Sequence, residues 1–286
     1  MFRTFFTRLT ALVVLSALSS TALFAAPSPS RSLLEINPAC SHISYSEPGL
    51  MEERGELYGI EARYSWHSEH PGAVDLLRGE VSASLGSFDY TSTSAGSIKG
   101  VHDSMLEARV LAGSDLYRQG ERLVTVLFGI GYRRLNDHSL GMVSTTGALG
   151  YDRQANYYYS PLGIEITTPL ENGWSMGGLA EYDLFWRGRQ VTGISPALLS
   201  GGSSSSNEFI NEQKRGYGLK ASVRFQKQLG ASSSLGIEPF FRYWSIGRSA
   251  TDSVVVTDAA GAGTTVTVVE PANSSSEYGI KVLFSF

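Results

Sequence analysis

The stretch Glu277-Tyr-Gly-Ile-Lys-Val-Leu-Phe-Ser-Phe286 alternates without interruption between two sets of side chains. One set is apolar and consists of Tyr278, Ile280, Val282, Phe284 and Phe286. Apart from Leu283, the residues between them are small or polar. Successive side chains of a β-strand point to opposite faces. The stretch therefore predicts a strand with one apolar face.

The start of the chain predicts export through a secretory signal peptide. Arg3 and Arg8 precede the apolar run 11–18, and small residues follow it. We expect a signal peptide over 1–26, cleaved between 22 and 26. The pattern of the C-terminal strand recurs along this exported chain, which favours an outer-membrane β-barrel of a Gram-negative bacterium.

Composition agrees with a barrel and excludes other classes. The mean hydropathy is −0.06, as expected when lipid-facing and inward residues cancel. Removing 1–26 takes away two arginines and no acid, so the formal charge falls from −4 to −6 and gives no footprint for nucleic acid. Cys40 is the single cysteine and cannot form an internal disulfide.

Period-two alternation predicts ten strands of an all-β fold. They are 42–48, 56–66, 74–86, 104–113, 121–134, 157–168, 174–187, 215–228, 234–247 and the C-terminal strand.

The connections between these strands set their number. Short turns alternate with the long connections 87–103, 135–156, 188–214 and 248–276. In transmembrane barrels the short turns are periplasmic and the long loops extracellular. An N-terminus in the periplasm then requires strand 42–48, so we predict an antiparallel up-and-down barrel of ten strands, with eight as the alternative. We expect 27–41 to be a short periplasmic segment, 42–286 the barrel, and 253–257 with 264–269 a hairpin in the last outer loop.

Several segments carry a likeness to known proteins. They are 172–189, 238–245 and the C-terminal strand. Through them the chain resembles bacterial outer-membrane β-barrels, and more narrowly an uncharacterised porin-like family of such barrels. The resemblance implies that Tyr278, Ile280, Val282, Phe284 and Phe286 form the C-terminal signal that the outer-membrane assembly machinery recognises. It also implies outer-membrane lipid and lipopolysaccharide as partners.

The size is similar to that of the omptin surface proteases. Omptins need acid pairs and an Asp-x-His pair at the barrel mouth. This chain has no Asp-x-His, and the connection 87–103 carries only Asp89 and Asp103. The omptin active site therefore does not carry over.

Sixteen charged residues of the predicted strands lie on the face opposite the apolar one, which predicts that they point into the lumen. A base at the lipid face costs about 2–4 kcal/mol at the bilayer midplane. The residues are Glu61, Arg63, Arg78, Glu80, Glu107, Arg109, Arg133, Glu165, Glu181, Asp183, Arg187, Lys220, Arg224, Glu238, Arg242 and Lys281.

These charges lead to the predicted function. Acids and bases nearly balance, and about ten strands enclose little more than side chains. We therefore expect an Arg–Glu network that fills the lumen of a non-enzymatic barrel with a structural or surface-interaction role. A narrow channel for small charged solutes is the alternative, and an outer-membrane protease or lipid A-modifying enzyme is a third.

Three short motifs bear on the enzymatic alternative. His42-Ile-Ser44 has the His-x-Ser spacing used by lipid A deacylase barrels, which also need a nearby carboxylate and an oxyanion stabiliser. Asp137-His-Ser-Leu-Gly141 departs from a nucleophile elbow at its first glycine. Residues 66–70 hold two histidines and a glutamate within a short turn. We interpret all three as polar rim or turn residues and predict no catalytic residue, cofactor or metal; the oligomeric state stays open.

Overall fold

The computed structural model describes residues 32–68, 72–193, 208–230, 232–257 and 263–286. The predicted signal peptide and residues 27–31 lie outside the described residues. No helix of the described residues is long and apolar enough to cross a membrane. The strands are β1 Ser32–Glu47, β2 Met51–His67, β3 Leu76–Ser92, β4 Gly96–Gln119, β5 Arg122–His138, β6 Arg153–Pro169, β7 Trp174–Gly193, β8 Glu208–Gln213, β9 Gly216–Gln228, β10 Ser234–Ile246, β11 Asp252–Thr257, β12 Gly263–Val268 and β13 Asn273–Ser285.

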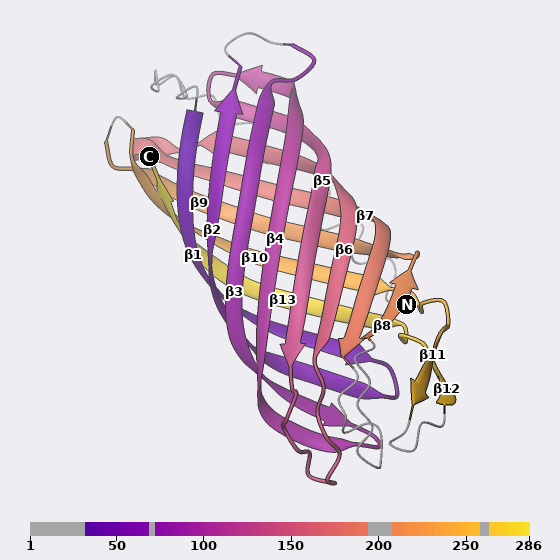
Figure 1. The fold of residues 1–286 in the computed structure, drawn as a ribbon. Coiled ribbons are helices and arrows are strands. Elements are labelled where there is room, and N and C mark those ends of the chain that lie inside the picture. Colours follow the sequence, from indigo (N-terminus) through magenta and orange to yellow (C-terminus); the bar gives the residue numbers. More distant parts are fainter. Residues whose placement is uncertain (1–31, 69–71, 194–207, 231, 258–262) are drawn as a thin grey trace, which may run out of the picture.

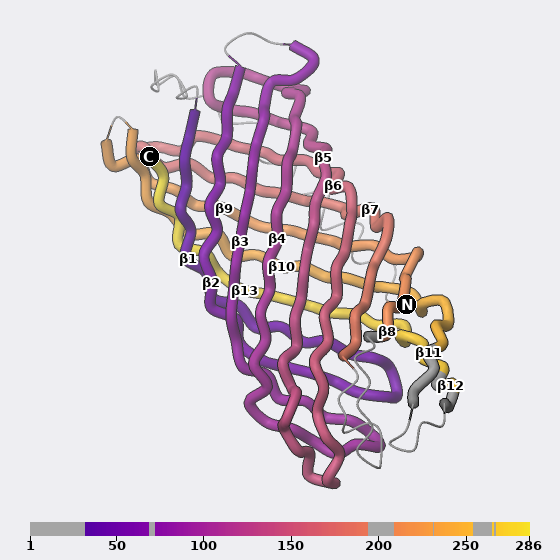
Figure 2. Tube along the Cα trace, in the orientation of Figure 1, coloured from indigo at the N-terminus to yellow at the C-terminus, as the bar shows by residue number. Residues whose placement is uncertain are grey.

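Ten of these strands form a closed antiparallel barrel, which confirms the predicted fold class and strand number. Each barrel strand pairs with its neighbour in the chain, and β1 pairs with β13 to close the wall (Figure 1). The backbone N–H of Phe286 donates to the carbonyl of Leu34 at 2.9 Å at this seam. The tube in Figure 2 shows the tilted strands running as one continuous wall.

The three remaining strands lie beyond the barrel wall. β8 pairs with the end of β7, and β11 pairs with β12. The β11–β12 hairpin confirms the hairpin predicted for the last outer loop. It lies at the end of the barrel opposite the C-terminus (Figure 1).

Short turns connect the strands at the C-terminal end of the barrel. Residues 120–121 join β4 to β5, and Gly120 has a φ of 61°, a left-handed conformation that glycine adopts without strain. The 3₁₀ turn η1, Glu171–Gly173, joins β6 to β7, with Asn172 at a φ of 57°. These turns mark the periplasmic end, because transmembrane barrels keep their short turns on that side.

Strand β1 begins ten residues earlier than predicted. Residues 32–41, which we expected to precede the barrel, belong to it. Pro38 obscured this part of the strand, because proline has no N–H for a ladder bond. The pairing of β1 with β13 skips residues 37 and 38, whereas the pairing with β2 is complete.

Several strands also extend beyond the membrane. On β2 the outward-facing residues from Tyr58 to Trp66 are apolar. The outward-facing residues nearer the extracellular end of this strand, Glu52, Arg54 and Glu56, are charged. Exposed rings mark the outer boundary of the apolar band: Tyr58, Tyr158, Trp186, Tyr217 and Tyr278. We define the membrane-spanning part of each strand as the stretch with an apolar outward face, and strand residues beyond this boundary lie above the membrane.

Candidate functional site: the charged interior

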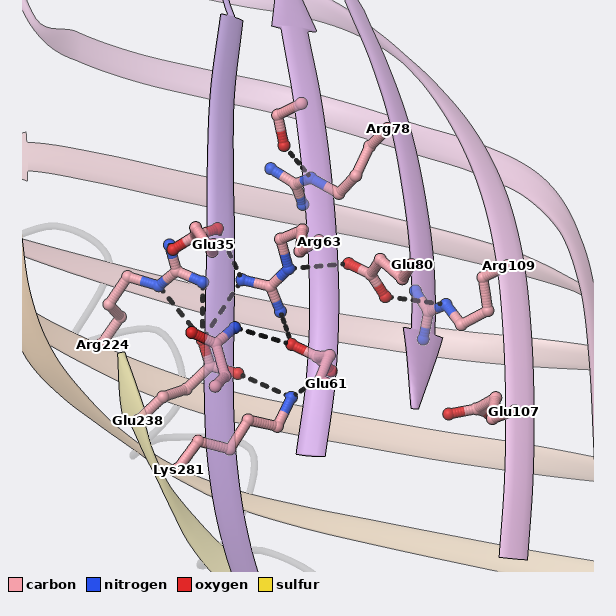
Figure 3. Close-up of polar contacts among 12 residues, drawn as sticks. Glu35, Glu61, Arg63, Arg78, Glu80, Glu107, Arg109, Arg224, Glu238 and Lys281 are labelled. Atoms are coloured by element: carbon pink, nitrogen blue, oxygen red, sulfur yellow. Dashed lines mark hydrogen bonds and ion pairs between the residues drawn. The ribbon is translucent and has the colours of Figure 1, made fainter. Parts of the chain in front are cut away.

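The interior of the barrel is filled by an ion-pair network centred on Arg63. This side chain is 4% exposed and lies 3.0 Å from Glu61, 3.1 Å from Glu80 and 3.4 Å from Glu35. Glu238 of β10 is 3.6 Å away. Figure 3 shows these carboxylates converging on the guanidinium from both sides. One arginine thus neutralises charge from four strands.

The network continues around this centre. Lys281 donates to Glu61 at 2.7 Å and lies 3.4 Å from Glu238. Arg224 lies 2.8 Å from Glu238 and donates to Glu35 at 2.9 Å. Glu35, Glu61, Glu80 and Glu238 therefore each have more than one cationic partner, which a charge removed from water requires.

Several ion pairs bridge strands that are not neighbours in the barrel wall, and three more of them hold the lumen together. Arg78 of β3 binds both carboxylate oxygens of Glu165 of β6, at 2.7 and 2.9 Å. Arg109 of β4 binds Glu181 of β7 in the same two-pronged way. In the third pair, the guanidinium of Arg242 on β10 donates to Glu107 on β4 at 2.7 Å. These contacts cross the lumen, because two or more strands separate the partners in the wall.

An aromatic layer lies on the outer side of the network. Tyr159 is fully buried and donates its hydroxyl proton to Glu107 at 2.5 Å. Its ring meets Trp244 edge-on at 5.0 Å, and Tyr157 lies 5.9 Å from the same indole. Arg133, which has no exposed surface, places its guanidinium 5.7 Å from the Trp244 ring. The layer separates the central network from the outer mouth.

A second, more acidic cluster lies above the membrane. Arg153 lies 2.8 Å from Glu53, 2.9 Å from Asp137 and 3.2 Å from Glu47. Asp103 lies directly opposite Asp137 on the neighbouring strand. Glu53, Asp103, Asp137 and Arg153 line a cavity of about 60 Å³, space for a few water molecules, together with apolar side chains such as Leu57 and Phe88.

The pKa values of this outer cluster are raised by burial. Desolvation, with Glu53 and Asp137 nearby, raises the pKa of Asp103 to about 9. Burial raises the pKa of Glu53 to about 7, against the attraction of Arg153. The pKa of Glu270, in the last outer loop, rises to about 7 for the same reason. A carboxyl that holds its proton more tightly when folded stabilises the folded state below its unfolded pKa. That contribution is lost as the pH rises through the folded value.

Replacing Asp103 by asparagine is therefore expected to raise the free energy of unfolding at pH 8 by at least about 2 kcal/mol. At pH 4 the carboxyl of the unfolded chain also begins to hold its proton, so the difference between the two proteins is expected to fall to about 0.5 kcal/mol. Urea unfolding in detergent micelles at both pH values measures this. Asp89→Asn, at an exposed position of β3, is the matched control. An equal effect of Asp103→Asn at pH 4 and pH 8 would contradict the assignment.

The structure places fifteen of the sixteen predicted inward charges on the inner face, with Arg187 as the exception. The side chain of Arg187 is 54% exposed and pairs with Glu212 at the outer rim. A β-bulge causes the difference, because Tyr158 pairs with Arg187 and Tyr159 pairs with Phe185, leaving Trp186 as an extra residue. The extra residue reverses the alternation, and the prediction for Arg187 is corrected accordingly.

The five residues predicted as the C-terminal signal lie on the outward face of the wall. Tyr278 and Phe286 are 58% and 62% exposed, and Ile280, Val282 and Phe284 are exposed between them. Lys281 of the same strand points inward. The C-terminal strand is thus apolar towards lipid and ionic towards the lumen.

Sequence reasoning missed other residues of the interior. Glu35 and Asn37 belong to the part of β1 that Pro38 obscured, and Asn37 donates to Glu61 at 3.1 Å. Extending the alternation of Leu34 and Ile36 backwards would have found both. Arg153 was assigned to a loop, although it begins β6. Glu277 shares the inward face with Lys281 and accepts a hydrogen bond from Ser41 at 2.9 Å.

The short motifs have different surroundings. The Ser139 hydroxyl donates to the carbonyl of Tyr151 at 2.6 Å, a bond that fixes the loop after β5. Residues 69–71 are outside the described part, so the motif at 66–70 is described only in part. Among the described residues no group of His, Cys, Asp and Glu has metal-site geometry. His42 and Ser44 lie on the outward face of β1, and the imidazole contacts Glu56.

Comparison with known proteins shows the fold. No family model matches the chain, and no curated protein is similar to it. The outer-membrane protease OmpT from Escherichia coli is similar in structure, with a TM-score of 0.53 and 10% identity over 93% of this chain and 99% of that chain. The translocator domain of the autotransporter NalP from Neisseria meningitidis aligns over 96% and 93% of the two chains with 10% identity and a TM-score of 0.40. The Pseudomonas putida toluene transporter TodX aligns over 90% of each chain with 9% identity and a TM-score of 0.33. The chain therefore has the ten-stranded fold of an outer-membrane β-barrel protein.

Proposed function

We propose that the protein is a sealed barrel of the bacterial outer membrane that acts at its outer surface and does not conduct solutes. The observation that carries this proposal is the set of ion pairs that cross the lumen, with Arg109 to Glu181 as the central one. Both side chains are at most 2% exposed. Lipids of the outer leaflet, lipopolysaccharide among them, are the partners that this role implies.

Bridges at successive heights support the closed lumen. Arg78–Glu165 lies nearest the periplasmic turns, Arg109–Glu181 follows, and Arg242–Glu107 lies below the aromatic layer. A solute would have to break two-pronged arginine–carboxylate contacts in a water-poor interior, and such contacts are among the strong hydrogen bonds in proteins. The outer cavity of about 60 Å³ lies above these layers.

Conductance in planar lipid bilayers tests the seal. The wild-type barrel is expected to insert without a steady current, because the bridges fill its cross-section. The double variant Arg109→Ser, Glu181→Ser removes one bridge but leaves the bridges above and below it, so it is expected to stay silent. Serine at all six positions of the three bridges is expected to admit discrete current steps. The matched control Arg187→Ser changes an arginine on the outside of the wall and is expected to stay silent. A steady wild-type current near that of a general porin would contradict the sealed lumen and favour a channel.

A further inference from the structure

His42, Ser44, Arg54 and Glu56 form a cluster on the outer wall of the barrel, which we name the outer-face cluster. His42 and Ser44 are two residues apart on β1, so their side chains share one face. Glu56 and Arg54 lie directly opposite them on β2. The interior network uses none of the four. From their arrangement we infer a Ser–His–Glu hydrolase site for acyl esters of outer-leaflet lipids.

The His42–Glu56 contact supplies the oriented base of such a site. The Nδ1 atom of His42 lies 2.7 Å from the carboxylate of Glu56. A carboxylate in this position holds the proton on Nδ1, which leaves Nε2 as the basic nitrogen. The same contact stabilises the imidazolium that forms when Nε2 accepts a proton. Glu56 is therefore a positioning residue, and His42 is the general base.

Ser44 is the nucleophile of the inferred site. Its Cα lies about 7 Å from that of His42, as for any pair i and i+2 on a strand, a gap that a serine and an imidazole on the same face can bridge after side-chain rotation. The Ser44 hydroxyl is 3.4 Å from Glu52, a long contact that a rotation about χ1 exchanges for the imidazole. Arg54 lies opposite Ser44 with its side chain 60% exposed, where it can stabilise an oxyanion.

The depth of the cluster in the membrane identifies the substrate class. Cys40 and Tyr58 pair at the outer edge of the apolar band, and His42 with Glu56 is the next outward pair. Tyr278 lies opposite His42 on the other side, with the two rings 5.3 Å apart. Tyrosine belts lie at the headgroup level, where the ester groups of membrane lipids meet water. A lipid acyl ester is thus the electrophile that reaches Ser44.

The reaction requires only water as a second reactant. Ser44 Oγ bonds to the acyl carbonyl carbon while its proton passes to His42 Nε2, and Arg54 stabilises the oxyanion. The ester C–O bond then breaks, and His42 returns the proton to the departing alcohol. Water attacks the acyl-enzyme in the same way, which releases the fatty acid and restores the Ser44 hydroxyl.

This inference departs from the sequence-based expectation of a non-enzymatic protein. It rests on the proposed function only for the placement of the outer wall in the outer leaflet. Hydrolysis and conductance are measured separately, so the two proposals fail separately. A conducting barrel that hydrolyses lipid refutes the seal, and a silent barrel that does not hydrolyse lipid refutes the site.

The test uses the full barrel in mixed micelles with phosphatidylglycerol or with lipid A. Released fatty acid is quantified, and an alkyl fluorophosphonate reports the reactive serine through the mass of the labelled peptide. We expect release from at least one lipid and one label on Ser44. The lipid that is cleaved identifies the source of the ester. Ser44→Ala is expected to reduce release at least about 100-fold and to abolish the label.

Two further variants separate catalysis from a structural role. Ser46→Ala changes the next residue on the same face of β1 and is expected to retain release and label. Glu56→Gln is expected to lower kcat for release and to leave KM unchanged, because the amide no longer fixes the proton on Nδ1 of His42. No release and no label from the folded wild type, a label on another serine, or unchanged release by Ser44→Ala would each overturn the site.

Discussion

Replacing Arg63 by methionine is expected to lower the free energy of unfolding by about 3–5 kcal/mol, the largest effect of any single change considered. Methionine keeps much of the length of the side chain but removes the charge. Glu35, Glu61, Glu80 and Glu238 then lose a partner that lies within 3.6 Å of each. Each of them keeps at least one other cationic partner, but the buried network then carries one more uncompensated negative charge, and uncompensated buried charge costs more than the pair itself contributes. Urea unfolding of the barrel refolded in detergent measures the loss.

Arg54→Met is the matched control for this experiment. Arg54 belongs to the same strand, and its side chain is 60% exposed and paired with Glu52 on the outer wall above the membrane. Exposed ion pairs contribute about 0–1 kcal/mol. The same substitution on the two faces of β2 therefore separates burial from loss of charge. Equal effects of the two variants would show that the interior is hydrated and that Arg63 is not the centre of the network.

The barrel and its inner face follow from the sequence because alternation is a local property. Alternation within each strand shows which side chains share a face. The alternation of short and long connections predicted the additional strand at 42–48. The same logic fails where a local feature interrupts it. Pro38 concealed the first ten residues of β1, and the bulge at Trp186 turned Arg187 outward.

The partners of the inward charges were not predictable in the same way. Alternation shows that Arg109 and Glu181 both face the lumen, but not that they meet, because β5 and β6 lie between their strands. That contact depends on strand tilt and stagger, which no local pattern records. The outer-face cluster illustrates the same limit. His42 and Ser44 were visible as a motif, whereas Glu56 joins them only through the pairing of β1 with β2.

Gly131→Val is expected to destabilise the barrel by about 3 kcal/mol through the aromatic layer. Gly131 lies directly opposite Tyr159. A Cβ at this position would meet three ring atoms of Tyr159, all within 2.7 Å. The ring has no exposed surface to move into, so it must give up its contact with Trp244 and its bond to Glu107. The loss combines overpacking with one oxygen of the buried Glu107 carboxylate that loses its donor, while the other oxygen keeps Arg242.

Gly79→Val is the matched control, because it makes the same substitution at a position with open space. Gly79 lies on the outward face of β3 between Leu77 and Val81, and a Cβ there meets no atom within 4 Å. Valine suits a strand, so this variant is expected to stay within about 0.5 kcal/mol of the wild type or to exceed it. The unfolding temperatures of the Gly131→Val and Gly79→Val variants are measured from the heat-dependent change in their migration on gels. Similar values for both variants would mean that Tyr159 does not pack on Gly131, and that the layer closing the outer side of the network is loose.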